Sequence, residues 1–177
     1  MDRLWAPWRV KYLTATKPDE CIFCAKAKAQ NDVEDLVLWR GEYGFVLLNL
    51  YPYNNGHLMV VPYEHVPSIE DLDVDVLAGL MEMVQKSMAV LRCAMHPDAF
   101  NVGLNIGAAA GAGVIEHVHI HVVPRWSGDT NFMLVLAGTR VVPDFLEHTY
   151  ELLQQAAREL GILPGCDAPP PPTESAP

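Results

Sequence analysis

Five segments of the chain are rich in valine, isoleucine, leucine and aromatic residues and are bounded by turn-forming residues, a pattern typical of β-strands. They are Leu36–Arg40, Gly44–Leu50, His57–Tyr63, Phe100–Ile106 and Val114–Val123. Tyr53-Asn54-Asn55-Gly56 lies between the second and the third, and suits a tight turn in which Gly56 adopts a positive φ. We therefore expect these two strands to form a hairpin.

Two further segments carry apolar residues at the spacing of an α-helix. Between Asp71 and Met95, apolar side chains recur every three or four residues and so fall on one helical face. They are Leu77, Leu80, Val84, Met88 and Leu91. A second helix is predicted from Pro143 to Leu160, with the proline in its first turn and Gly161 beyond its end. Together with the strands, these helices indicate an α+β domain on an antiparallel sheet of about five strands, with a long helix and a C-terminal helix.

The composition fits one folded domain. The chain has 177 residues, of which 50% are hydrophobic and 19% charged, so it has enough apolar side chains to fill a core. No apolar stretch approaches the roughly 20 residues of a membrane-spanning helix, and the first residues lack the apolar middle of a signal peptide. We therefore expect a soluble, cytoplasmic protein without membrane partners, whose cysteines are reduced thiols.

The ends of the chain differ from its middle. Four consecutive prolines and the absence of apolar periodicity mark residues 164–177 as a proline-rich disordered tail. Residues 1–20 are taken as an N-terminal arm, and residues 21–163 as a single folded domain.

The net charge is −10, from 22 acidic and 12 basic residues. This excess of acid argues against a broad surface for nucleic acid or anionic lipid. A small anionic ligand stays possible, because a pocket can be locally positive on an acidic protein.

The strongest chemical signal is the segment His117-Val118-His119-Ile120-His121-Val122-Val123. Side chains alternate between the two faces of a strand, so the three imidazoles share one face and the apolar residues the other. Neighbouring imidazoles disfavour protonation of one another, which keeps at least one of them neutral near neutral pH. A neutral imidazole can attack phosphorus or bind a metal.

A run of small residues, Asn105 to Gly113, enters this histidine strand. Glycines let backbone N–H groups approach an anion closely, so a phosphate could sit between this loop and the imidazoles. Such loops also exist merely to turn the chain. Their position directly before three aligned histidines favours the phosphate site.

A second candidate is Cys21-Ile22-Phe23-Cys24. Two cysteines at this spacing can chelate zinc, but a tetrahedral site needs two further ligands. The alternatives are a redox pair or two buried thiols.

These residues resemble the histidine-triad (HIT) superfamily, whose pattern is His-φ-His-φ-His-φ-φ, with φ an apolar residue. The segment from Asn49 to His57 is similar to the nucleoside-binding hairpin of that family, and Val123-Pro124-Arg125-Trp126 to the segment after its histidines. The flanking Leu4–Arg9 and Trp126–Phe132 are most similar to the bacterial branch that includes diadenosine tetraphosphate phosphorylases. The resemblance implies a HIT-like fold.

The resemblance also implies nucleotidyl transfer through a covalent intermediate. His119 would attack the α-phosphorus of an adenine nucleotide or dinucleoside polyphosphate and hold the nucleotidyl group, and phosphate or water would then release it. His121 and His57 would contact phosphate oxygens or orient His119. Such a reaction needs no organic cofactor.

Other positions carry over from the same resemblance. Asn49 would bind the ribose hydroxyls, and Asn105 with the backbone of Gly111, Ala112 and Gly113 would bind the phosphates. Many family members have a serine or glutamine in this loop, and the present chain lacks that side-chain donor. This departure leaves phosphorolysis and hydrolysis open, and Arg125 is a further candidate phosphate contact.

Zinc-bearing members of the superfamily have a histidine at the spacing of His65. On that basis Cys21, Cys24, His65 and His117 would hold one structural zinc, in a closed site without room for a catalytic water. If zinc is absent, His117 returns to the phosphate site.

Three other functions stay open at this point. The protein could hydrolyse nucleoside phosphoramidates, or be a nucleotide-binding interaction module with little catalysis. It could also be a metalloenzyme with zinc on all three histidines of the triad, which would leave the cysteine pair and His57 unexplained. By resemblance we expect a homodimer, with a tetramer as the alternative.

Overall fold

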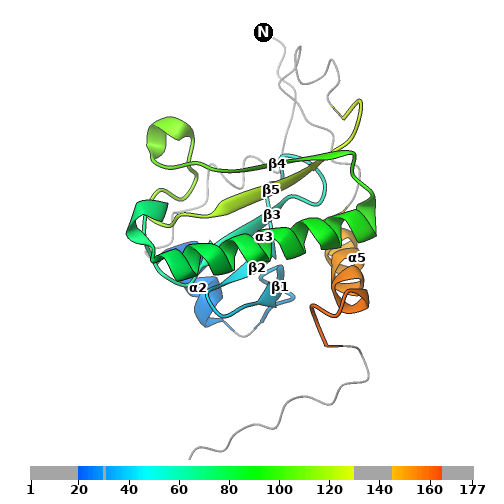
Figure 1. The fold of residues 1–177 in the computed structure, drawn as a ribbon, viewed down its shortest axis with the longest axis horizontal. Coiled ribbons are helices and arrows are strands. Elements are labelled where there is room, and N and C mark those ends of the chain that lie inside the picture. The colour runs from blue at the N-terminus through cyan, green and yellow to red at the C-terminus, as the bar shows by residue number, and fades with distance from the viewer. Residues whose placement is uncertain (1–19, 30, 130–144, 165–177) are drawn as a thin grey trace, which may run out of the picture.

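The computed structural model describes residues 20–29, 31–129 and 145–164, which form an antiparallel five-stranded sheet with helices on both faces (Figure 1). The strands are β1 (Val37–Arg40), β2 (Gly44–Leu48), β3 (Leu58–Pro62), β4 (Ala99–Leu104) and β5 (Ile120–Arg125), in the spatial order β1-β2-β3-β5-β4. Every neighbouring pair is antiparallel. The predicted α+β class and the five strands are confirmed.

The hairpin predicted around Gly56 is present. Strands β2 and β3 pair in continuous register from Gly44 opposite Pro62 to Leu48 opposite Leu58. Gly56 lies in the turn with a φ of +73°, a conformation that few residues other than glycine adopt.

The prediction for the last strand is wrong in its first half. Strand β5 begins at Ile120 instead of Val114. Its partner β3 ends at Pro62, which has no N–H to continue a ladder. The N–H of Val118 instead donates to the carbonyl oxygen of Val66, at 2.7 Å. Two of the three histidines therefore lie just outside the regular strand.

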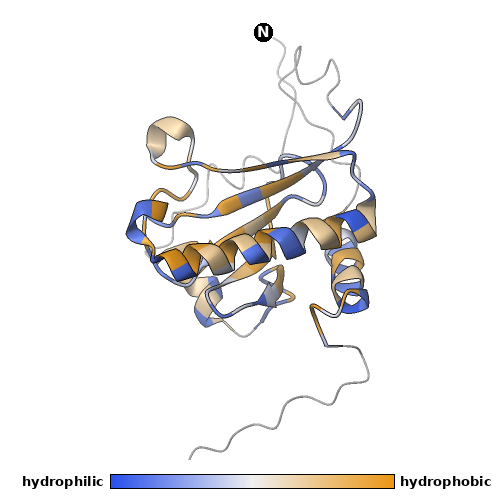
Figure 2. Cartoon of the chain, in the orientation of Figure 1, coloured by the Kyte–Doolittle hydropathy of each residue, from blue (hydrophilic) through white to orange (hydrophobic). Residues whose placement is uncertain are grey.

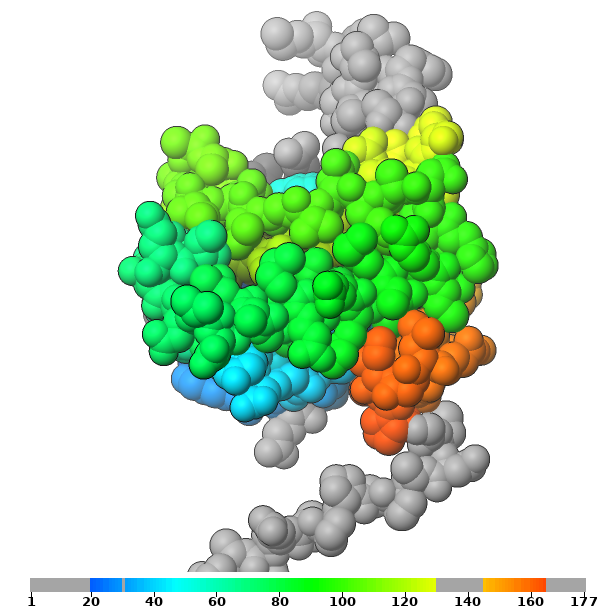
Figure 3. Space-filling model, in the orientation of Figure 1, coloured from blue at the N-terminus to red at the C-terminus, as the bar shows by residue number. Residues whose placement is uncertain are grey.

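Two of the helices cover one face of the sheet. Helix α3 (Val74–Met95) crosses it, and α5 (Leu146–Glu159) packs beside α3, as Figures 1 and 3 show. Hydrophilic residues recur along the outward side of α3 (Figure 2), as its amphipathic spacing predicts. Gly161 follows α5 with a φ of +68°, while Pro143 lies outside the described residues. The described residues also include the one-turn 3₁₀ helices η1 (Ile69–Asp71) and η2 (Ala108–Ala110).

The alternation of strand residues creates two cores. Val46, Leu48, Val60, Ile120 and Val122 face α3 and α5, and Val118 joins them. A second and smaller cluster lies on the opposite face. It consists of Phe23, Val37, Phe45, Leu47, Met59 and Val61.

A short helix covers this second face, and the sequence patterns did not predict it. Helix α2 (Ile22–Lys28) has only seven residues, too few for a clear apolar period, and Phe23 is its buried anchor. The described helices include none that is both long and apolar enough to cross a membrane.

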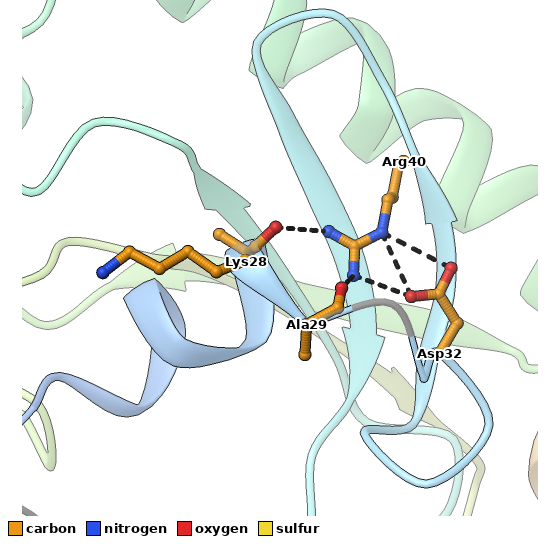
Figure 4. A pocket seen from close by; sticks show the side chains of 5 residues that line it. Lys28, Ala29, Asp32 and Arg40 are labelled. Carbon is orange, nitrogen blue, oxygen red and sulfur yellow. Dashed lines mark hydrogen bonds and ion pairs between the residues drawn. The ribbon is translucent and has the colours of Figure 1, made fainter. Parts of the chain in front are cut away.

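Arg40 of β1 fixes the end of α2 (Figure 4). Its guanidinium donates to the carbonyl oxygens of Lys26, Ala27 and Ala29 at 2.9–3.0 Å, and pairs with Asp32 at 2.7 Å. The hollow of about 360 Å³ beside it contains none of the predicted site residues. Since a helix end leaves carbonyls without partners, we interpret this arginine as a helix cap.

We expect Arg40→Ala to lower the free energy of unfolding by about 2 kcal/mol, because three carbonyls lose a charged donor that is partly shielded from water. Urea unfolding measures the change. Lys86→Ala, which removes only an exposed ion pair with Glu82, is the control and should cost about 0.5 kcal/mol or less. Equal losses in the two variants would contradict the capping role.

Candidate active site and metal centre

Four histidines gather on the face of the sheet that is opposite α3 and α5. His117, His119 and His121 come from β5 and the segment before it, and His57 directly precedes β3. All four side chains are buried, with at most 9% of their surface exposed. The predicted separation of the imidazoles from Val118, Ile120 and Val122 is therefore present, although only His121 belongs to the regular strand.

A backbone carbonyl fixes the tautomer of His119. Its Nδ1 lies 3.0 Å from the carbonyl oxygen of His117, and a carbonyl can only accept, so Nδ1–H donates. The lone pair of the neutral ring is then on Nε2. Burial lowers the pKa of His119 below the ordinary value of 6.5, which favours this neutral form. His119 therefore has the state that a nucleophile requires.

A chain of hydrogen bonds fixes His57 and His121. The N–H of Tyr53 donates to Nδ1 of His57 at 3.0 Å, so the ring proton of His57 is on Nε2. That Nε2–H donates to Nδ1 of His121, 2.9 Å away. The proton of neutral His121 is consequently on its Nε2, where it can be donated outward. Burial, and secondarily His119, lower the pKa of His121 to about 4.

The two predicted asparagines both lie against this chain. Nδ2 of Asn49 is 3.1 Å from Nδ1 of His57, and its Oδ1 accepts from the N–H of Tyr51. The side-chain amide of Asn105 lies 3.4 Å from Nε2 of His121. The structure thus brings Asn49 and Asn105 to opposite ends of the His57–His121 pair.

The small-residue loop has the positive φ angles that favour glycine, +81° at Gly107 and +85° at Gly111. The N–H groups of Gly111 and Ala112 donate within the loop, to the carbonyl oxygens of Ala108 and Gly107. Gly113 is exposed. In this conformation the loop is therefore closed on itself rather than wrapped on the imidazoles.

Arg125 is engaged by two polar side chains. Its guanidinium pairs with both carboxylate oxygens of Asp129, at 2.6 and 2.8 Å, and also donates to Asn101. The ion pair neutralises its charge locally in this structure, and its contact with phosphate stays a prediction.

Cys21, Cys24, His65 and His117 form a compact cluster at the start of α2. The potential ligand atoms lie within 4.8 Å of one another. Nδ1 of His117 is 3.5 Å from Sγ of Cys21, 3.7 Å from Sγ of Cys24 and 3.3 Å from Nδ1 of His65. Nδ1 of His65 is 3.2 Å from Sγ of Cys24.

Four of the six separations between ligand atoms, 3.2–3.7 Å, are close to those expected for zinc. Ligands at zinc–sulfur and zinc–nitrogen bond lengths in a tetrahedron lie about 3.3–3.8 Å apart. Nε2–H of His117 donates to the carbonyl oxygen of Pro62 at 2.9 Å, so the lone pair of its Nδ1 points into the cluster. Such a partner on the other ring nitrogen is usual for a metal-bound histidine. Burial is the main cause of the lowered pKa of His117, which keeps it neutral.

Comparison with known proteins identifies the family of the chain. The HIT domain family matches residues 30–128, more than half of the chain. The chain belongs to the HIT domain family. A relative named AP-4-A phosphorylase, from Mycobacterium tuberculosis (strain CDC 1551 / Oshkosh), is 44% identical to this chain over 161 residues. The alignment covers 86% of this chain and 83% of that protein.

Two other relatives add a second enzyme and a solved structure. A bis(5'-nucleosyl)-tetraphosphatase (asymmetrical) of Schizosaccharomyces pombe is 33% identical over 93 residues, 52% of this chain and 50% of that protein. The crystal structure of a zinc-bound histidine triad family protein from Mycobacterium smegmatis superposes with a TM-score of 0.64. That protein is 30% identical in sequence, and the superposition covers 81% of this chain and 96% of the other chain. The HIT-like fold expected from the sequence is thus confirmed.

Two contacts of this HIT domain were not predicted. The carbonyl oxygen of Pro62 orients His117, and the ring of Phe23 lies against both His117 and His119. The contact with Pro62 depends on how the backbone packs, and a sequence motif does not determine that packing. The sequence draws attention to Phe23, because it lies between the two cysteines. Its contact with His117 and His119 could be identified only from the position of α2 in the structure.

We expect the purified protein to carry about one zinc per chain, the content of one closed tetrahedral site. Removing it should lower the free energy of unfolding by about 3 kcal/mol or more, because binding and folding are coupled. Metal analysis and urea unfolding measure both quantities. Cys24→Ser should lose zinc, whereas Cys93→Ser, at a free thiol of α3, should keep it. Equal zinc contents in the two variants would contradict the assignment.

Proposed function

We propose that this HIT protein cleaves dinucleoside polyphosphates of the diadenosine tetraphosphate type by transferring a nucleotidyl group first to His119 and then to phosphate or water. The observation that carries the proposal is the hydrogen bond from Nδ1 of His119 to the carbonyl of His117, which leaves the Nε2 lone pair for attack. The names of the relatives, a phosphorylase and a tetraphosphatase of such substrates, support the same enzyme class.

The first step forms a bond between Nε2 of His119 and the α-phosphorus. The bond from that phosphorus to the bridging oxygen breaks, and the remaining nucleoside polyphosphate leaves with the electron pair. The ring becomes cationic, with its proton still on Nδ1. The carbonyl oxygen of His117 accepts that Nδ1–H and so stabilises the charge at the place where it develops.

The second step reverses the first with a new acceptor. An oxygen of phosphate or water attacks the same phosphorus, the phosphorus–nitrogen bond breaks, and neutral His119 is restored. Phosphate gives a nucleoside diphosphate, whereas water gives the monophosphate. Two displacements at one histidine avoid a single displacement between two anions.

The neighbouring polar residues have supporting roles. His121 donates from Nε2 to a phosphoryl oxygen, and His57 holds it in that tautomer. Asn49 binds the ribose, and Asn105 with the backbone of Gly111, Ala112 and Gly113 contacts the phosphates once the loop opens toward the substrate. Each of these roles follows from the family resemblance together with the positions described above.

The zinc proposed for this chain is structural. Cys21, Cys24, His65 and His117 would hold it, and four protein ligands leave no position for water. Zinc supplies folding free energy there, fastening α2 to the segment that carries His119. The alternative of a catalytic zinc on all three triad histidines is disfavoured by His117, because its Nε2 donates to the carbonyl of Pro62 and its Nδ1 faces the cysteine cluster instead of the other two histidines.

Incubation with diadenosine tetraphosphate, with and without phosphate, tests the proposed reaction. ADP and ATP that form only with phosphate indicate phosphorolysis, and AMP with ATP indicates hydrolysis. His119→Ala should lower turnover on the order of a thousandfold or more while binding survives, because no other group replaces the nucleophile. A mass increase of one adenylyl group on His119, trapped after rapid quenching, identifies the intermediate.

The control is His148→Ala, at an exposed position on α5. It should leave turnover unchanged. Binding without any product would support the interaction module instead, and turnover confined to nucleoside phosphoramidates would support the alternative hydrolase. Sedimentation of the same samples tests the predicted homodimer.

We expect the rate of nucleotidyl transfer to stay flat from about pH 8 down to 6.5, the ordinary imidazole value, and to fall only below it. The reason is that His121, with its pKa near 4, stays neutral over that range and can accept the proton of His57. Once protonated, His121 has no lone pair for this bond, so the loss occurs as the pH falls. Single-turnover rates at constant ionic strength measure the profile, and a half-maximal rate at pH 6.5 would contradict it.

A further inference from the structure

Phe23 is an aromatic side chain that contacts both His117 of the cysteine–histidine cluster and the proposed nucleophile His119. It lies in the first turn of α2, between Cys21 and Cys24, with 1% of its surface exposed. Its ring centre is 4.9 Å from that of His119, at 55°, and 5.4 Å from that of His117, at 71°. The ring therefore touches one member of each candidate site.

His119 depends on such a contact, because its backbone is outside the strand ladder. Its imidazole is flanked by Phe23 and by the ring of His121, whose centre is 4.7 Å away at 74°. The hydrogen bond to the carbonyl of His117 holds one nitrogen, so the far side of the ring, with Nε2, depends on packing. Packing on both sides is what limits rotation of the ring.

Phe23 is itself held from three directions. Cys21 and Cys24 lie in the cluster with His117, Arg40 caps the other end of α2, and the second core surrounds the ring. A shift at either end of this short helix would move Phe23 against His119.

We propose that Phe23 is a positioning residue that keeps the imidazole of His119 aligned for attack. The proposal rests on the proposed function for its catalytic consequence, but the contact itself is independent of it. Catalysis is sensitive to such contacts, because misplacement of a reacting group by about 1 Å can cost about a hundredfold in rate.

Phe23→Leu is the test, and Phe45→Leu is its matched control. Phe45 is in the same second core and is equally buried, but its ring faces Tyr63 and Arg40. Both variants lose a ring from one cluster, so similar falls in the urea midpoint are expected. Phe23→Leu should lower the single-turnover rate of nucleotidyl transfer about tenfold with little change in KM. Phe45→Leu should stay within about twofold of the wild type.

A spectroscopic measurement separates positioning from activity. Isotope-edited NMR of the histidine side chains, at one fixed pH, should show His119 as a single Nδ1–H tautomer in the wild type and in Phe45→Leu. In Phe23→Leu the same signal should broaden or split as the ring samples other orientations. If the wild type turns over no substrate, the proposed function fails, and the NMR result alone still decides the role of Phe23.

Several results would overturn the proposal. Equal rates and equal spectra in the two variants would show that the ring has only a packing role. Loss of zinc from Phe23→Leu but not from Phe45→Leu would show that it acts on the cluster instead of on His119. If Phe23→Leu does not fold, Phe23→Met, which fills similar volume without a ring, replaces it. Absence of proton contacts between the Phe23 and His119 rings in the wild type would contradict the proposal whatever the variants do.

Discussion

The hydrogen bond from His119 to the carbonyl oxygen of His117 depends on where His117 is held, and most of the candidate site depends on that bond. His117 is buried, and each of its two ring nitrogens faces a different group. Its Nε2–H donates to Pro62, and its Nδ1 faces two thiols and His65. A side chain fixed at both nitrogens also fixes its own backbone, which is the acceptor for His119. One residue therefore links the candidate metal cluster to the ring that we propose as the nucleophile.

The sheet carries a second, smaller core on the face with the imidazoles. The larger core under α3 and α5 lies on the opposite face. Among the described residues, the helix on the face with the histidines has only seven residues, and Phe23, the cysteine–histidine cluster and Arg40 hold it in place. Short isolated helices are marginal in water, so α2 depends on these contacts. The proposed zinc would add to the stabilisation that capping by Arg40 provides.

The residues differ in how far their roles could be predicted. Alternation alone predicted that Val118, Ile120 and Val122 lie on the face opposite the histidines. This prediction holds also at Val118, which lies before the regular strand begins. Gly56 was identifiable because its turn requires a positive φ. The tautomers of His119 and His117 could not be predicted, since they depend on carbonyls placed by tertiary packing, one of them on Pro62 in another strand. The closed state of the Gly107–Gly113 loop is likewise a matter of backbone hydrogen bonds.

The net negative charge of the chain does not extend to the groups that orient the histidines. The partners that orient His119, His121 and His57 include a backbone carbonyl, a backbone N–H and a neighbouring imidazole, all of them uncharged. Burial lowers the pKa of His119 and His121, so these rings meet a phosphate chain as neutral dipoles. A cationic site would bind the anionic substrate and products tightly in the ground state. In the reaction proposed above, neutral groups would interact most strongly as charge moves onto the His119 ring and the phosphoryl oxygens. On that proposal an acidic protein can act on a polyphosphate without a basic surface, because the favourable interaction is concentrated in the transition state.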